Sequence, residues 1–125
     1  MTNEQDFETL AAGLTPLTPA VFHILLALGG GSLHGYGIML EVEKFTHGQM
    51  SLGAGTLYRS IQRMQGDGLI EEDPSGPSTG DDERRRNYRL TPLGTHVARD
   101  EASRLAQLVE VSKQKGILPK KGKHI

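Results

Sequence analysis

The feature that most restricts the fold of this chain is the stretch TPAVFHILLALGGG, residues 18–31. Thr18 suits the N-cap of a helix, and Pro19 suits its first position because no amide hydrogen is needed there. From Val21 to Leu28 apolar residues recur at i, i+3, i+4 and i+7, which predicts a helix with a buried stripe. Three consecutive glycines then end the pattern. We therefore expect a chain of short helices around a core.

Residues 32–48, SLHGYGIMLEVEKFTHG, predict a second helix with Ser32 as its cap and Gly48 as its stop. The apolar residues at helical spacing on its expected buried face are Ile38, Val42 and Phe45. Gly35 and Gly37 are poor helix formers. They indicate that another backbone or a ligand lies close to this helix.

A third helix is predicted over residues 54–67, with Ser51 as its cap. Its expected buried stripe consists of Leu57, Ile61 and Met64. Because successive helical residues are about 100° apart, other side chains lie on the opposite face. These are Arg59, Gln62, Arg63 and Gly66. One face of this helix is thus predicted to pack on the core and the other to be exposed and cationic.

Two more helices are predicted at the ends of the chain. Residues 3–12 favour a short one with Phe7 and Leu10 on one side. Thr91 and Pro92 repeat the Thr-Pro start signal and open a long helix that ends near Gly116. Its broad apolar stripe consists of Ala98, Ala102, Leu105, Leu108 and Val109. A domain this small has little spare surface to cover that stripe, so a two-fold dimer is the simpler solution.

Two short extended runs, residues 69–72 and 86–90, flank a loop rich in Pro, Ser, Gly and Asp. This composition predicts a β-hairpin with a long tip. Short helices followed by a hairpin are the plan of a winged helix-turn-helix, in which the second helix of the turn pair enters the major groove. The predicted fold is mostly α with a small β-hairpin and a long C-terminal helix.

Composition excludes several classes of function. Among the 125 residues there is no Cys, hence no disulfide framework, thiol nucleophile or Cys-based zinc site, which fits a reducing cytoplasm. The five histidines lack the spacing of a metal site, and no nucleophile motif frames a catalytic set, so we expect neither an enzyme nor a cofactor. No signal peptide is evident, and the longest apolar run is too short to span a bilayer. We expect a cytoplasmic protein.

The stretch GAGTLYRS, residues 53–60, raises the question of a phosphate. A nucleotide-binding loop would need a strand before it and a Lys-Ser or Lys-Thr pair after it, and both are missing. The glycines instead shape a helix start, whose free amides can bind a DNA phosphate. The net charge of −1 conceals a basic cluster at residues 84–89 and a basic tail. A local patch of this kind attracts a polyanion.

Three stretches, LHGYGI, GTLYRSIQRMQGDGLIE and RRRNYRLTPLG, resemble in order and spacing the signatures of PadR-type transcriptional regulators. The resemblance extends from about Leu17 into the long final helix. It implies a dimeric winged-helix repressor whose last helix forms the dimer interface. The chain resembles the short form of the family, which has a single final helix.

The resemblance places DNA reading on the GTLYR segment and backbone contacts on the wing. The expected DNA-binding residues are His34, Tyr36, Ser51, Gly55, Thr56, Tyr58, Arg59, Gln62, Arg63, Arg84, Arg85 and Arg86. For Tyr58, packing beside the core is the alternative to a phosphate contact. For His34, it is a capping role. Since successive residues of a strand point to opposite sides, the three wing arginines cannot all face DNA.

The predicted organisation has four parts. These are an N-terminal arm or short helix at 1–14, a winged helix-turn-helix domain at 15–91, a dimerisation helix at 92–116 and a basic flexible tail at 117–125. The expected dimer-interface residues are Phe7, Leu10, Ala98, Ala102, Leu105, Leu108 and Val109. The expected partners are double-stranded DNA with a pseudo-palindromic operator and a second copy of the chain, with no membrane.

Two alternatives stay open at the level of sequence. The first is a winged helix that binds a protein and not DNA, which the acidic wing tip and the net charge favour. The second adds a small-molecule inducer in an apolar pocket at the dimer interface. Some short-form relatives use a tryptophan there, whereas this chain has no Trp and carries Leu105 at about that place.

Overall fold

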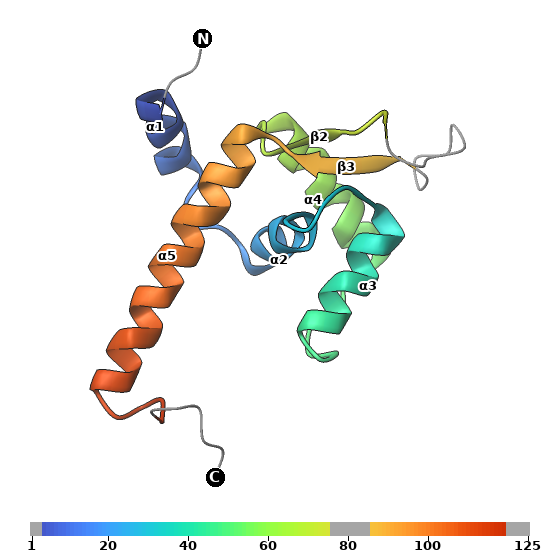
Figure 1. Ribbon diagram of the computed structural model, residues 1–125. Coiled ribbons are helices and arrows are strands. Elements are labelled where there is room, and N and C mark those ends of the chain that lie inside the picture. The colour runs from blue at the N-terminus through green and yellow to red at the C-terminus, as the bar shows by residue number, and fades with distance from the viewer. Residues whose placement is uncertain (1–3, 76–85, 120–125) are drawn as a thin grey trace.

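The computed structural model describes residues 4–75 and 86–119, with the side chains of residues 4–7 outside that description. In this part of the chain there are five helices and three short strands (Figure 1). In chain order they are α1 (Glu4–Leu14), α2 (Pro19–Leu28), β1 (Leu33–His34), α3 (Gly35–Phe45), α4 (Ala54–Gly66), β2 (Ile70–Glu72), β3 (Asn87–Leu90) and α5 (Pro92–Gln114). The prediction of a mostly helical winged fold is confirmed.

Both Thr-Pro helix starts are confirmed. The Thr18 hydroxyl accepts a hydrogen bond from the Val21 amide at 3.3 Å, and α2 begins at Pro19. At the start of α5 the Thr91 hydroxyl accepts from the Gly94 amide at 2.9 Å and donates to the Gly68 carbonyl at 2.5 Å. The second bond ties the end of the α4 turn to the start of α5.

The predicted caps of α3 and α4 are wrong. Ser32 does not cap α3, because residues 33–34 are held extended as β1 and the helix can begin only after them. Ser51 does not cap α4 either, because the buried Leu52 anchors the connecting segment to the core. The N-cap of α4 is Gly53, while the Ser51 hydroxyl donates to Glu43 Oε2 at 3.2 Å.

The wing is part of a three-stranded antiparallel sheet in the order β1-β3-β2, and not a hairpin alone. β3 is central, with Leu33 of β1 and Glu72 of β2 both opposite Tyr88. Strand β1 was missed because two residues give no alternating pattern to detect. It fixes the start of α3 against the wing.

The core lies where α2, α3, α4 and the sheet meet. The predicted stripe of α4 is confirmed, since Leu57, Ile61 and Met64 are all buried. In α3, Ile38 and Val42 are buried as expected. Phe45 is not part of the core; it is exposed and stacks on the ring of His23, with centroids 5.9 Å apart.

Helix α5 packs on this core through its first turns only. Leu93 and Val97 are buried, and α1 lies across the same end of α5 with Ala11 buried (Figure 1). The rest of α5 extends away from the domain. The winged domain and the free length of α5 are therefore distinct surfaces of the molecule.

Candidate nucleic-acid interface

Helix α4 carries the cationic surface that its periodicity predicts. While one side is buried in the core, Arg59, Gln62 and Arg63 are exposed. Arg63 Nε lies 3.9 Å from Asp67 Oδ2, but the Arg63 side chain is 78% exposed, so this ion pair is weak. Both guanidinium groups remain accessible to a partner.

The start of α4 offers backbone donors beside this surface. Gly53 occupies the N-cap without a side-chain hydrogen bond, so no side chain caps the first-turn amides. Gly55 and Thr56 are exposed there. A Cβ on Gly55 would lie 3.4 Å from Arg59 Nη1, which places that guanidinium over the first turn. Free amides, the helix dipole and an arginine converge where an anion would bind.

Tyr58 lies between the two helices of the turn. Its side chain is half-buried, and a Cβ on Gly35 would overlap its hydroxyl and lie 2.9 Å from its Cζ atom. The absence of a side chain at Gly35 thus serves close packing of α3 on α4, one of the two explanations expected for that glycine. The phosphate contact of Tyr58 stays a prediction.

His34 is the N-cap of α3, so its alternative role in capping is confirmed. Its Nδ1 accepts a hydrogen bond from the Gly37 amide at 2.9 Å, which leaves the proton of the neutral ring on Nε2. The ring of Tyr36 stacks beside it with centroids 6.4 Å apart, and Tyr36 is exposed. The two rings stand at the start of α3, the helix that precedes α4.

The wing arginines are only partly within the described residues, because Arg84 and Arg85 lie outside them. Arg86 is exposed just before β3, with its Nε 3.8 Å from Glu72 Oε1. Such an exposed pair adds little stability and leaves Arg86 accessible.

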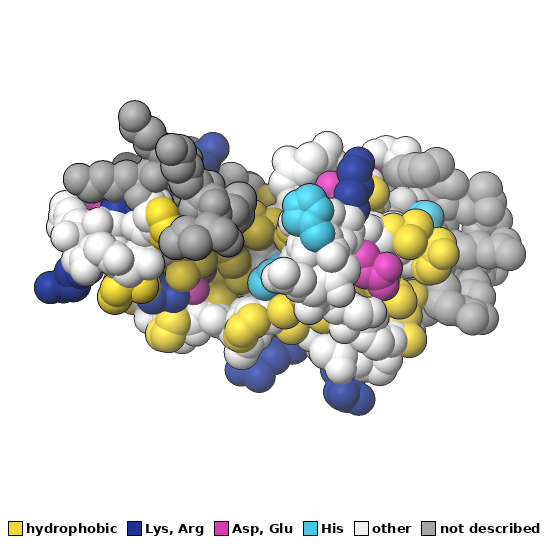
Figure 2. Space-filling view, turned by 90° about the horizontal axis from the view of Figure 1, so that it is seen from below, with side chains coloured by type: hydrophobic (Ala, Val, Ile, Leu, Met, Phe, Trp, Pro, Cys, Tyr) yellow, Lys and Arg dark blue, Asp and Glu magenta, His cyan; other side chains and the backbone are white. Residues whose placement is uncertain are grey.

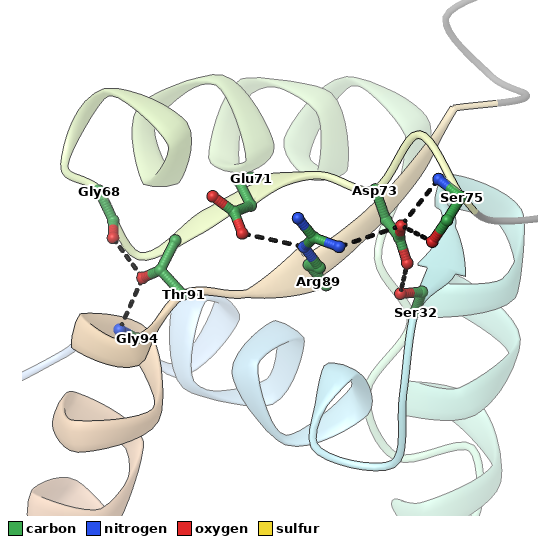
Figure 3. Close-up of polar contacts among 8 residues, drawn as sticks. All are labelled: Ser32, Gly68, Glu71, Asp73, Ser75, Arg89, Thr91 and Gly94. Atoms are coloured by element: carbon green, nitrogen blue, oxygen red, sulfur yellow. Dashed lines mark hydrogen bonds and ion pairs between the residues drawn. The ribbon is translucent and has the colours of Figure 1, made fainter.

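A polar network at the base of the wing was missed by sequence reasoning (Figure 3). Arg89 Nε donates to Glu71 Oε2 at 2.9 Å, and its Nη1 donates to Asp73 Oδ1 at 3.2 Å. Asp73 also accepts from the Ser75 amide at 3.0 Å and from the hydroxyls of Ser75 and Ser32. Glu71 lies directly opposite Arg89 across the sheet, and this cross-strand pair was the only available signal. Ser32 is far away in sequence.

The hydrogen bonds to Asp73 change its titration. The Ser32 hydroxyl, followed by the Ser75 hydroxyl, lowers the pKa of this carboxyl to about 2 against the opposing effect of burial. Asp73 is therefore ionised at any ordinary pH. It joins the α2–β1 connection, β2 and β3 at one point.

The apolar stripe of α5 is largely uncovered by its own chain. Ala98 and Leu105 are half-buried and Ala102 is exposed, while Leu108 is 50% and Val109 44% exposed. On α1, Leu10 is also exposed, and the side chain of Phe7 lies outside the described part. Hydrophobic side chains are visible on the face seen from below, toward which the free end of α5 points (Figure 2).

The uncovered part of α5 begins after Glu101, a buried carboxylate that pairs with Arg104, whose side chain is 47% exposed. Glu101 is only 3% exposed and accepts two hydrogen bonds of 2.8 Å from Arg104. These bonds, with a smaller contribution from the Leu17 backbone, lower the pKa of Glu101 against its desolvation. Glu101 thus fixes α5 to the connection between α1 and α2.

Other kinds of site find no support in the described residues. No group of three His, Asp or Glu side chains there is arranged to hold a metal ion. Among the helices of residues 4–75 and 86–119, none is long and apolar enough to cross a bilayer.

Comparison with known proteins gives a consistent result. Residues 24–100 match the model of the "Transcriptional regulator PadR-like family". A curated protein of Streptomyces fradiae, an uncharacterized 37.1 kDa protein in transposon TN4556, is 33% identical over 86 residues. Those residues are 68% of this chain but only 22% of that protein, so the chain matches about a fifth of its length.

Three solved structures share the fold. A transcriptional regulator from Clostridium thermocellum is 21% identical with a TM-score of 0.62, over 91% of this chain and 97% of that one. A PadR family transcription regulator from Clostridium difficile is 23% identical with a TM-score of 0.63, over 78% and 97%. RosR from H. salinarum is 27% identical with a TM-score of 0.59, over 77% and 81%.

Proposed function

Because the chain belongs to the PadR-like family of transcriptional regulators, we propose that it is a homodimeric repressor that reads a pseudo-palindromic operator with α4. The observation that carries this proposal is the exposed face of α4. It combines Arg59, Gln62 and Arg63 with an uncapped helix start, while the opposite face is fixed in the core. Family membership also agrees with the expectation of a regulator and not an enzyme.

The proposed reading residues have distinct roles. Arg59 and Arg63 have the side-chain chemistry for bidentate pairing with guanine in the major groove. The amides of the first turn, at Gly55 and Thr56, suit a phosphate, which would fix the depth of the helix. His34 and Tyr36 would contact the backbone beside the groove, and Ser51 would do so from the turn.

The wing would hold the neighbouring backbone. Arg86 supports this because it is accessible at the outer end of β3. The same role for Arg84 and Arg85 rests on the family motif alone. We expect these contacts to be salt-sensitive and independent of base sequence.

Dimerisation through α5 would complete the function. The uncovered stripe around Leu105, Leu108 and Val109 suits a two-fold contact between the same helices of two chains, with α1 beside it. In this organisation residues 15–91 form the DNA-binding unit and 92–116 the dimerisation helix, flanked by the arm at 1–14 and the tail at 117–125. The two copies of α4 would then meet half-sites about 34 Å apart. Repression would follow from occupation of a promoter.

Fluorescence anisotropy tests the proposal. A labelled duplex from the region upstream of the protein's own gene is compared with a scrambled duplex, at low and moderate salt. We expect selective, salt-dependent binding that Arg59→Ala weakens by about tenfold or more, since a bidentate base contact contributes about 1–3 kcal/mol. Arg99→Ala is the matched control, because Arg99 is also exposed but lies on α5.

The possible outcomes separate the proposal from its rivals. Equal loss of affinity in Arg59→Ala and Arg99→Ala would remove α4 as the reading helix. Failure to bind either duplex at low salt would contradict DNA binding and favour the protein-interaction alternative.

A further inference from the structure

A cavity of about 390 Å³ lies between the connection of α1 to α2, the start of α2 and one side of α4. Cavities that hold small organic ligands begin at about 300 Å³, so this one is large enough for such a molecule. It lies away from the free stripe of α5. It is therefore distinct from any pocket that a dimer would form there.

The wall of the cavity is aliphatic. Leu14, Leu17 and Val21 line it from the α1–α2 side, and Met64 lines it from α4. Within the described part of the chain no aromatic ring lines it, so the wall offers no surface for stacking. A flexible hydrocarbon chain suits this wall better than a flat aromatic molecule.

The opposite side of the cavity is cationic. Arg59 and Arg63, one turn apart on α4, both line it, together with Ser60 and with Asp67, the one carboxylate among the lining residues, so this side keeps a net positive charge. Among the described carboxylates none forms an ion pair with Arg59, and Asp67 only weakly offsets Arg63. Guanidinium groups bind carboxylates through strong, charge-assisted hydrogen bonds. A carboxylate head group is thus the natural complement to this side.

We propose that the cavity binds an aliphatic monocarboxylate, with its chain against the wall and its head group on Arg59 and Arg63. The bound carboxylate occupies the same two guanidinium groups that reading DNA requires. Ligand and operator therefore compete directly, with no change of fold. The competition rests on the proposed function of α4, whereas the binding of the carboxylate does not.

Isothermal titration calorimetry of the full chain with octanoate, without DNA, tests the binding site. We expect saturable binding of one octanoate per chain. Octanol lacks the charge, octylammonium carries the opposite charge and acetate lacks the long chain. Each should bind at least tenfold more weakly than octanoate. Arg59→Gln should weaken octanoate binding about tenfold, since a hydrogen bond to a charged group contributes about 1.5–3 kcal/mol. Equal binding of octylammonium, or no effect of Arg59→Gln, would overturn the site.

A second variant tests the location without touching the proposed DNA-reading residues. Val21→Phe fills the cavity and should weaken octanoate binding at least tenfold, while Leu26→Phe, on the exposed side of the same helix, should not. Methyl NMR of the wild-type chain locates the bound octanoate without any substitution, so this test does not depend on whether the Val21→Phe variant folds. Octanoate should shift the signals of Leu17, Val21 and Met64, and shifts confined to α5 would overturn the location.

Competition is measured by adding octanoate to the duplex complex. Saturating octanoate should raise the apparent Kd of the wild type at least tenfold and leave that of Val21→Phe unchanged. An unchanged wild-type Kd at saturation would overturn the competition. A chain that binds octanoate but no duplex would overturn the proposed function and support the cavity, so the two failures are distinguishable.

Discussion

Single residues connect separate elements of this molecule. Gly94, at the start of α5, lies so close to the Leu69 backbone that a Cβ would overlap the carbonyl oxygen. A Cβ at Gly35 would likewise overlap the side chain of Tyr58. Asp73 links three segments through its hydrogen bonds. These positions hold the wing and the two helices of the turn in register.

The contact at Gly94 predicts a specific loss of stability. Gly94→Ala should destabilise the fold by about 1–3 kcal/mol or more, because backbone cannot move aside as a flexible side chain can. Chemical denaturation followed by circular dichroism measures this. Gly66→Ala, a helical site with open space around it, should instead stabilise by about 0.5–1 kcal/mol. The same response in both variants would contradict the close contact.

Asp73 predicts a pH dependence. Its pKa is about 2 in the fold against an ordinary value of 3.8, so its contribution to stability is complete above about pH 4. That contribution is lost as the pH falls through about 2. Asp73→Asn should lower the melting temperature at pH 7 and reduce the steepness of the decline below pH 4. A parallel decline in wild type and variant would show that Asp73 does not contribute to acid stability.

Elements show where sequence patterns succeed and where they do not. The stripes of α2 and α4 and both Thr-Pro starts follow from local rules, because spacing and capping depend on neighbours in the chain. The starts of α3 and α4 do not. Pairing of β1 with β3 and burial of Leu52 decide them, and both come from distant segments. The Asp73 network could not be predicted for the same reason, since Ser32 lies in the connection between α2 and β1, 41 residues away in the sequence.

The uncapped start of α4 predicts opposite effects of two similar substitutions. Gly53→Asp and Gly53→Ser both supply a capping oxygen, so both should raise stability by about a few tenths of a kcal/mol. Only the aspartate adds a negative charge where a DNA phosphate is proposed to bind. Anisotropy should show weakened DNA binding for Gly53→Asp and near wild-type binding for Gly53→Ser. Equal affinities would contradict a phosphate at this helix start.

At the scale of the whole molecule, the winged domain closes its own core while α5 leaves a stripe uncovered. The sequence predicts this stripe through its period, but the covering partner is not a property of one chain. The exposure of Leu108 and Val109 supports the proposed dimer, whose oligomeric state has a direct test.

Leu108→Glu should convert the proposed dimer to a monomer, because it would bury a charge in an apolar contact. Sedimentation velocity at micromolar concentration measures the change. Leu40→Glu is the matched control, since Leu40 on α3 is exposed to nearly the same degree but lies outside the stripe. Dissociation by both variants, or by neither, would contradict an interface centred on α5.

The hydroxyl of Thr91 hydrogen-bonds both to Gly68, just after the end of α4, and to Gly94 in the first turn of α5. Thr91 therefore lies at the junction between α4, the proposed reading helix, and α5, a helix of 23 residues that is about 35 Å long. In a dimer joined along the two α5 helices, a rotation of a few degrees at Thr91 displaces the two copies of α4 by ångströms relative to each other. The geometry at Thr91 would then set the length of operator that the two copies of α4 can span, although this residue lies far from any base that the protein would contact.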